Sequence, residues 1–270
     1  MEITLSDSEF ARFQRFIYEA AGIQMSDAKK ALVSSRLSGR LRERAIPSFG
    51  EYFRLISSGG EEDEKQTAVD LLTTNETYFF REPKHFEFLH KLLTSRPPSG
   101  RPFRVWSAAS SSGEEAFSTA MLLADRLGDQ PWEIFGSDLS TRVIIKARTG
   151  HFSMERANLL PPEYLKRFCL KGTGPQDGTL LIASELRARV RFEQVNLAQN
   201  LPELGLFDVI FLRNVMIYFD KDTKSAVVAR LLNALYPGGY FLIGHTETLH
   251  GIDDTLESVA TAIYRKPPKP

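Results

Sequence analysis

Short apolar runs alternate with amphipathic helical segments after Pro102, and this alternation restricts the fold more than any other feature of the chain. The run 207–212, FDVIFL, predicts a strand buried on both faces of a sheet. Further strands are expected at 103–106, 132–136, 190–195 and 239–243, and helices at 116–127, 143–147 and 226–235. Repeated strand–helix units predict a parallel sheet with helices on both sides, and right-handed crossovers make it a doubly wound α/β fold.

The first 75 residues follow a helical period instead. Ser6 with Glu9, and Ser48 with Glu51, have the spacing of capping boxes, and Gly22 is a helix stop. We therefore expect an all-α domain at 1–75, a linker and connecting helix at 76–102, and the α/β domain at 103–270. The breaker cluster 96–102 supports the second boundary. A Gly-rich turn between apolar runs predicts a small antiparallel β insert at about 165–193.

Composition excludes several classes of protein. Lys+Arg and Asp+Glu both number 34, so the surface as a whole is not built for nucleic acid or an anionic membrane. A single cysteine, Cys169, excludes an internal disulfide or a Cys-rich metal site, and the five histidines have no metal-binding spacing. Because the N-terminus lacks an apolar run and no stretch approaches the roughly 18 residues of a membrane span, we expect a cytoplasmic protein.

The loop 107–115, SAASSSGEE, follows the first expected strand and opens a helix. Its small residues allow backbone to approach a ligand closely. It lacks the G-x-G-x-x-G pattern, and Glu114 and Glu115 stand where a pyrophosphate would otherwise bind, which argues against a nicotinamide-dependent oxidoreductase. The paired acids favour a ligand with a cationic part, such as a methionine ammonium. The alternative is a Ser/Gly turn with helix-capping acids.

Polar residues also follow three other strands. Asp138 could accept hydrogen bonds from ribose hydroxyls, or cap the next helix. Asn196, which precedes Leu197, could contact an adenine edge or form a turn. Arg213 and Asn214 directly follow FDVIFL, with Tyr218 shortly after, and they are either a site or a polar strand ending.

Two further segments carry candidate residues. The segment 73–82, TTNETYFFRE, is too aromatic for a simple linker; we interpret it as folding over a cofactor, with interdomain core as the alternative. The helix at 26–44 is strongly basic, and part of it forms an i, i+4 stripe. This is either a solvated face or a docking surface for an acidic helix, and its candidate residues are Lys29, Lys30, Arg36, Arg40 and Arg44.

These motifs together resemble the CheR-type chemotaxis receptor (chemoreceptor glutamate) O-methyltransferase family over nearly the full length. The resemblance is carried by TTNETYFFRE at 73–82, FRVWSAASSSGEEAFS at 103–118, FGSDLS at 135–140, FDVIFLRNVMIYFDK at 207–221 and LYPGGYFLIGHTE at 235–247. The family often has Cys or Ala where this chain has Ser110. The resemblance implies a helical N-terminal domain, a Rossmann-like class I methyltransferase domain and a small β-subdomain inserted in it.

The resemblance also implies the cofactor, the partner and the site. The cofactor is S-adenosylmethionine, with S-adenosylhomocysteine as product, and the partners are cytoplasmic helices of methyl-accepting chemoreceptors rather than nucleic acid or inserted membrane. A monomer is favoured, and the basic helix matches the receptor-docking element. The expected cofactor contacts are Asn75, Thr77, Arg81, Glu115, Asp138, Asn196, Leu197, Arg213 and Asn214. Tyr218 matches a tyrosine near the transfer site, and with Arg81 it is expected to position the acceptor or the cofactor carboxylate.

The absence of a nucleophile motif is compatible with this chemistry. A glutamate with a pKa of about 4.3 is already ionised at neutral pH, so methyl transfer to it needs no general base. Two alternatives stay open. One is a methyltransferase with another acceptor, such as RNA or a small molecule. The other is a non-catalytic protein that senses S-adenosylmethionine or S-adenosylhomocysteine.

Overall fold

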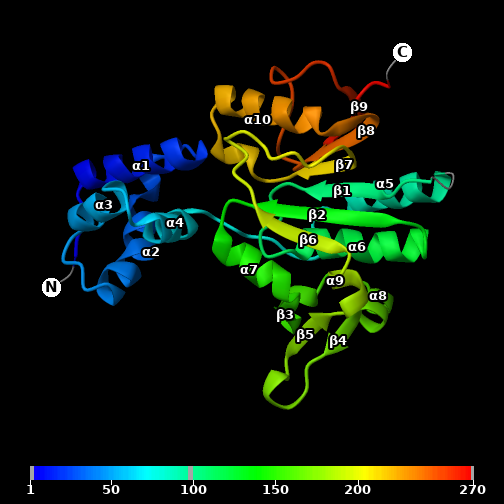
Figure 1. Ribbon diagram of the computed structural model, residues 1–270, viewed down its shortest axis with the longest axis horizontal. Helices are drawn as coiled ribbons and strands as arrows, with labels where there is room; N and C mark the ends of the chain where they lie inside the picture. The colour runs from blue at the N-terminus through cyan, green and yellow to red at the C-terminus, as the bar shows by residue number, and fades with distance from the viewer. Residues whose placement is uncertain (1–2, 97–99, 269–270) are drawn as a thin grey trace. The chain divides into compact units, whose positions relative to one another are not determined.

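A computed structural model describes residues 3–96 and 100–268. The chain forms two compact units (Figure 1). One consists of Met1–Thr74 with Tyr218–Thr223, and the other of Asn75–Ile217 with Lys224–Pro270. Residues 97–99 of the breaker cluster expected at 96–102 lie outside the described residues. No helix in the described parts of the chain is long and apolar enough to cross a membrane.

In the helical unit, helix α1 begins and ends at the capping residue and the glycine that the sequence indicated. Its helices are α1 (Asp7–Ala21), η1 (Asp27–Lys29), α2 (Lys30–Glu43), α3 (Phe49–Ser57) and α4 (Glu62–Leu72). The capping box at Ser6 is confirmed, since Ser6 accepts from the backbone N–H of Glu9 and the Glu9 carboxylate accepts from that of Ser6. Gly22 ends α1 with φ 69°, in the left-handed region that glycine adopts without strain.

The basic stripe on α2 has partners on α4 within the same unit, and a docking role for Arg36 and Arg40 stays a prediction. Arg36 donates to the carbonyls of Leu71, Leu72 and Thr73, which end α4 without helical partners. Arg40 pairs with Glu64, the Nε–Oε1 distance being 2.8 Å. Spacing of four residues places side chains on one face of a helix, but it does not say whether that face meets solvent or protein.

The remaining members of the stripe are more accessible. Lys30 pairs with Asp7 at 2.6 Å, and Arg44 lies 3.7 Å from carboxylate oxygens of Glu61 and Glu64. Lys29 and Arg44 are exposed. Their neighbour Arg42 is also exposed, and receptor docking by the basic helix stays a prediction.

Glu64 connects three helices of this unit. Its side chain is only 2% exposed, and it accepts hydrogen bonds from Arg40 and from the Tyr52 hydroxyl at 2.8 Å. The hydrogen bond from Arg40 holds the pKa of Glu64 below its ordinary value, although burial opposes this. Removing one member of a buried ion pair leaves the other without compensation.

We predict that Glu64→Gln lowers the free energy of unfolding of the helical unit by about 3 kcal/mol at neutral pH. Because the folded pKa is lowered, this contribution is present above the unfolded pKa of about 4.3 and is lost as pH falls through the folded value. Urea denaturation at several pH values measures both effects. Glu61→Gln, at an exposed position, is the control and should change little. Equal stability of wild type and Glu64→Gln at pH 7 would contradict the assignment.

The second unit contains the predicted doubly wound sheet. Its strand order is β6-β2-β1-β7-β8-β10-β9, and the first five strands are parallel. The bounds of the strands are β1 (Phe103–Ser107), β2 (Trp132–Asp138), β6 (Val190–Gln194), β7 (Phe207–Leu212), β8 (Leu235–Ile243), β9 (Glu257–Ala260) and β10 (Ile263–Arg265). The last two are antiparallel additions that the sequence did not predict. The fold class is confirmed.

The pairing register of the main sheet places the C-terminal ends of β2, β1 and β7 side by side. Ser107 at the end of β1 pairs with Gly136 of β2 on one side and with Phe211 of β7 on the other. The loops that follow these strands therefore leave from the same edge of the sheet, where ligands bind in doubly wound folds. The major helices of this unit are α5 (Pro83–Ser95), α6 (Glu114–Leu127), α7 (Thr141–Thr149) and α10 (Lys221–Asn233).

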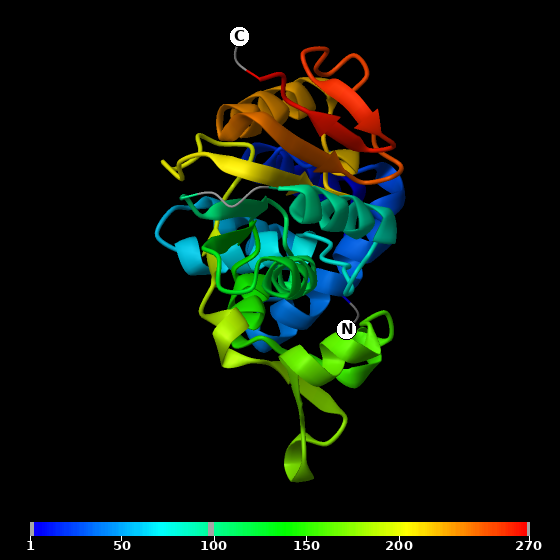
Figure 2. The ribbon, with the colours of Figure 1, turned by 90° about the vertical axis from the view of Figure 1, so that its right-hand side faces the viewer.

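The small antiparallel sheet has the order β3-β5-β4. The insert that contains this sheet comprises β3 (His151–Ser153), η2 (Met154–Ala157), α8 (Pro162–Phe168), β4 (Cys169–Lys171), η3 (Gly174–Gln176), β5 (Thr179–Ile182) and α9 (Ser184–Arg187). It thus begins earlier than the expected 165–193, and Val190–Gln194 belongs to the main sheet. A strand of only three residues, such as β3, leaves almost no periodic signal. The turn between β4 and β5 projects from the unit in two perpendicular views (Figures 1 and 2).

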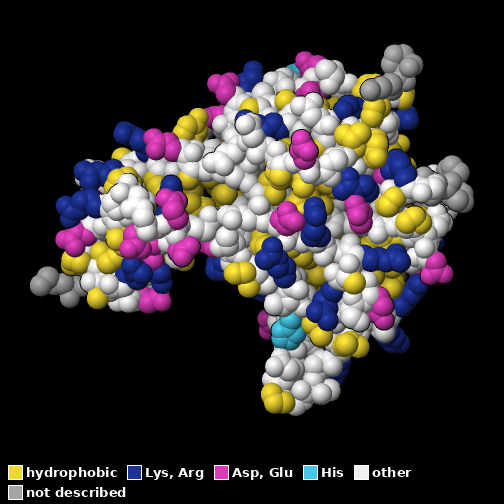
Figure 3. All heavy atoms as spheres, in the orientation of Figure 1, with side chains coloured by type: hydrophobic (Ala, Val, Ile, Leu, Met, Phe, Trp, Pro, Cys, Tyr) yellow, Lys and Arg dark blue, Asp and Glu magenta, His cyan; other side chains and the backbone are white. Residues whose placement is uncertain are grey.

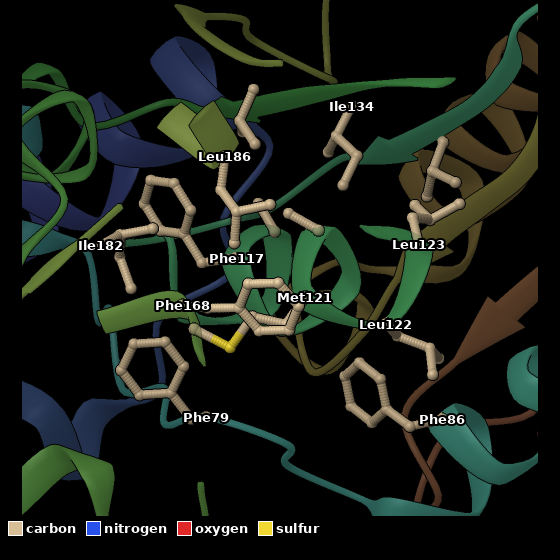
Figure 4. Packing of buried hydrophobic residues seen from close by; sticks show 14 of the residues in the cluster. Phe79, Phe86, Phe117, Met121, Leu122, Leu123, Ile134, Phe168, Ile182 and Leu186 are labelled. Atoms are coloured by element: carbon tan, nitrogen blue, oxygen red, sulfur yellow. The ribbon is translucent and has the colours of Figure 1, made fainter. Parts of the chain in front are cut away.

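The core of this unit lies against α6. Phe117 and Met121 of α6 pack with residues of the insert such as Phe168 and Ile182 (Figure 4). The insert therefore shares the core of the main sheet rather than standing as a separate domain. On the face visible in Figure 3, Lys and Arg are interspersed with Asp and Glu, as expected for a chain with zero formal net charge.

Candidate functional site

The loop after β1 packs closely against residues of α7 and β6. At Gly113 φ is 98°, and a Cβ there would lie 3.0 Å from that of Ala147 and 3.1 Å from the Phe192 ring, so only glycine fits without rearrangement. Ser111 has φ 49°, which is uncommon for a residue with a side chain. Its N–H donates to Asp138 at 2.9 Å. The small residues of the loop thus let its backbone pack directly on the end of β2.

Asp138 is buried at that strand end. Its carboxylate accepts from the backbone N–H of Ser111 at 2.9 Å and from that of Ser140 at 3.0 Å. Ser140 is the N-cap residue of α7, so Asp138 is not the cap itself. Through these two bonds, the Asp138 carboxylate links the loop after β1 to the loop after β2. A ribose-binding role for Asp138 stays a prediction.

Arg213 is the centre of an ion-pair cluster at the end of β7. It is 6% exposed, and its Nη1 donates to Glu115 at 2.8 Å while its Nε donates to Glu82 at 3.2 Å. Its Nη2 donates to the carbonyl oxygen of Arg81. The guanidinium of Arg213 is therefore buried between two carboxylates, and a cofactor contact by Arg213 stays a prediction.

The two acids at the start of α6 have separate arginine partners. Glu114 is fully buried and pairs with Arg156 of the insert and with the Ser112 hydroxyl. Glu115 accepts from the Ser107 hydroxyl at 2.6 Å as well as from Arg213. The expectation that both acids present negative charge to a ligand is wrong for Glu114, which faces the insert. A cofactor contact of Glu115 stays a prediction.

The segment 75–82 lies along the same strand ends. The Asn75 carbonyl accepts from the Ser111 hydroxyl at 2.7 Å, and the Phe80 N–H donates to Ser118 at 2.9 Å. Phe79 is fully buried and packs on Phe152 with ring centroids 5.0 Å apart. Phe79 and Phe80 are thus anchored in the core of the second unit.

The polar side chains of this segment are less buried. Thr77 and Arg81 are part-exposed, and Arg81 lies over the exposed Tyr78 ring at 5.6 Å and donates to the Glu76 carbonyl at 3.0 Å. The segment therefore has an anchored side and an accessible side. Coverage of a cofactor by it stays a prediction.

Three more of the predicted residues have local environments of their own. The Asn196 side chain accepts from the backbone N–H of Ala198 at 3.0 Å, a bond of the kind expected for a turn residue. A contact between Asn196 and an adenine stays a prediction. Leu197 is buried beside Asn196. Tyr218 groups with the helical unit, where its carbonyl accepts from Gln24 at 2.7 Å.

Glu247 was not identified from the sequence. It accepts from the backbone N–H groups of Asn214 at 2.9 Å and Gly244 at 2.7 Å, and burial raises its pKa. A Cβ on Gly244 would lie 2.6 Å from the Asn214 amide nitrogen, so glycine is needed beside it. Glu247 thus holds the loop after β7, which continues along the chain into Tyr218. The acid follows β8 in a turn, and only its place in the motif at 235–247 marks it.

Comparison with known proteins decides the family. Residues 8–73 match the family model "CheR methyltransferase, all-alpha domain", and residues 75–265 match "CheR methyltransferase, SAM binding domain". The chain belongs to the CheR methyltransferase family. It is 42% identical over 265 residues to "Chemotaxis protein methyltransferase" of Escherichia coli strain K12, which covers 97% of this chain and 92% of that protein.

A relative from Pseudomonas aeruginosa is equally informative. It is named "Chemotaxis protein methyltransferase 2" and is 41% identical over 266 residues, covering 97% of this chain and 94% of its own. The protein is therefore an S-adenosylmethionine-dependent methyltransferase, as the motifs predicted.

The residues at the strand ends fit this cofactor. Among the described residues, the Ser110 hydroxyl and the Asn214 amide oxygen are buried without a hydrogen-bond partner. Such atoms are rare in folded proteins, and a bound polar ligand would satisfy them. They lie in the loops after β1 and β7, where the strand order reverses and where doubly wound folds bind nucleotide-like ligands.

We predict that Arg156→Ala weakens binding of S-adenosylmethionine about tenfold, because Glu114 would keep a buried carboxylate without its cation beside the loop after β1. Isothermal titration calorimetry measures the affinity. Arg167→Ala is the matched control, since Arg167 is an exposed arginine of the same insert that pairs with Asp125. Unchanged affinity in folded Arg156→Ala protein would show that this pair does not support the cofactor loop.

Proposed function

We propose that this protein transfers the methyl group of S-adenosylmethionine to glutamate side-chain carboxylates of bacterial chemoreceptors, forming glutamyl methyl esters in sensory adaptation. The observation that carries the proposal is the match of both units to the two domains of one family, whose relatives are named chemotaxis protein methyltransferases. The receptor helices that carry the acceptor are the proposed partner.

The cofactor contacts are proposed to come from one edge of the main sheet. Arg213, Glu115 and Asp138 are joined there by the loops after three adjacent strands. The full proposed set is Asn75, Thr77, Arg81, Glu115, Asp138, Asn196, Leu197, Arg213 and Asn214.

The chemistry needs alignment more than acid–base catalysis. The bound cofactor supplies an electrophilic methyl group on a sulfonium. The acceptor glutamate is ionised at neutral pH, so the protein has only to orient and desolvate it. Orientation of this kind contributes roughly 7–11 kcal/mol to lowering a barrier. Arg81 supports this role, since its part-exposed guanidinium has more N–H donors than its bonds to the Glu76 carbonyl and the Tyr78 ring use.

Receptor docking is proposed for the basic helix of the helical unit, with Lys29, Lys30, Arg36, Arg40 and Arg44 as its residues. Lys29 and Arg44 are exposed, whereas Arg36 and Arg40 also have partners within the unit. An acidic receptor helix would meet these exposed cations, and the contact would weaken as salt is added.

The first test of the function is transfer of radiolabelled methyl from S-adenosylmethionine to membranes that contain chemoreceptors. We expect label that is released as methanol by mild base, since carboxyl methyl esters are hydrolysed under those conditions. A receptor with glutamines at its acceptor positions is the matched control and should take up no label. Cofactor binding without label on any receptor would reject the proposed acceptor and favour a sensing role.

A second test concerns Tyr218. We predict that Tyr218→Phe lowers kcat at least tenfold, or about 1.4 kcal/mol of barrier, with little change in cofactor affinity, because it removes one hydroxyl hydrogen bond from the aligned acceptor. Tyr18→Phe is the control, since Tyr18 is an exposed tyrosine of the same unit that bonds Asp220. Unchanged turnover would remove Tyr218 from the transfer site.

A further inference from the structure

Three side chains from two distant segments converge beside Arg213. Glu82 precedes α5, His85 lies in its first turn, and His245 follows β8. One potential ligand atom from each lies within 4.8 Å of the other two. The Nδ1 atom of His85 is 3.4 Å from Glu82 Oε2, and His245 Nε2 is 4.0 Å from the same oxygen. Sequence spacing could not reveal this group, because His245 is far along the chain from the other two.

His85 is the unexplained member of this group. Its side chain is fully buried, and neither ring nitrogen has a hydrogen-bond partner among the residues that the structure describes. A buried polar group without a partner is energetically unfavourable, and such groups in folded proteins indicate a water, ion or ligand that would satisfy them. The nitrogen that faces Glu82 is therefore placed where a bound cation would satisfy it.

The donor atoms of these residues suit a transition metal. Imidazole nitrogens and carboxylate oxygens are the donors that zinc-class ions bind in proteins.

We propose that Glu82, His85 and His245 form a binding site for a zinc-class divalent transition metal ion. Two imidazoles and one carboxylate form a common three-ligand zinc set, with water in the fourth position. Imidazole ligands disfavour Mg²⁺ and Ca²⁺. Zinc bonds to nitrogen and oxygen are about 2.0–2.2 Å long, so the ligands must approach slightly closer than they now lie.

His245 can supply this movement. Its side chain is 32% exposed, whereas His85 is fixed in the core. The carboxylate of Glu82 also accepts from Arg213 at 3.2 Å, and the positive charge of Arg213 weakens the site relative to a structural zinc centre. The site is consequently one for reversible binding, and it is independent of which acceptor the enzyme methylates.

The experiment is titration of the full-length, tag-free protein with Zn²⁺ by calorimetry and with Co²⁺ by visible absorption. We expect one equivalent of metal and cobalt bands of nitrogen and oxygen ligation. His245→Ala should weaken binding at least tenfold, since it removes a ligand but keeps the backbone N–H that bonds Glu82. His245→Gln, of similar size, is the second variant in case the alanine protein folds poorly.

Two controls separate this site from other binding. His250→Ala removes an exposed histidine from the same turn region and should leave the titration unchanged. Cys169→Ser tests the single thiol, whose pKa is raised to about 11 by burial, and it should also leave the titration unchanged. Absence of binding at micromolar zinc, or binding that both His245 variants leave unchanged, would overturn the proposal. Failure of methyl transfer to receptors would not affect this result.

Discussion

The catalytic unit depends on the buried guanidinium of Arg213. It joins three parts of the chain that are remote in sequence, since it follows β7, pairs with Glu115 of α6 and pairs with Glu82 before α5. Its bond to the Arg81 carbonyl also fixes the backbone of the segment 75–82. A buried arginine without these partners would cost several kcal/mol, so the segment and the sheet edge adopt one mutual arrangement.

That arrangement strains the backbone around it. Around the ends of β1 and β7, positive φ is found at Phe80, Glu82, Ser111 and Asn214, all of which carry side chains. Each such conformation costs on the order of 1 kcal/mol and persists only where its surroundings determine it. The aromatic packing of Phe79 on Phe152 and of Phe80 on Phe86 stabilises the segment against this cost. Strain therefore concentrates where function is expected, while the core beneath it is regular.

Sequence predicted the parts whose signals are local. The capping box at Ser6, the stop at Gly22 and the strand FDVIFL depend on neighbouring residues, and each was found as expected. Partners distant in sequence were not predictable. The i, i+4 spacing of Arg36 and Arg40 did not show that their face meets α4, and nothing near Glu114 indicated Arg156. The strand β3 has three residues, too few for a period to be detected.

The pairing of Arg213 also bears on methyl transfer to a carboxylate. A carboxylate is a weak nucleophile, and a strong ion pair with an arginine would stabilise it in the ground state and make it weaker. Here the guanidinium of Arg213 is shared between Glu82 and Glu115, and that of Arg156 is bound to Glu114. These two cations are thus neutralised within the protein. Arg81 then remains to orient an anionic acceptor, and because its guanidinium is part-exposed, this contact would be screened by solvent more than a buried ion pair with Arg213 would be.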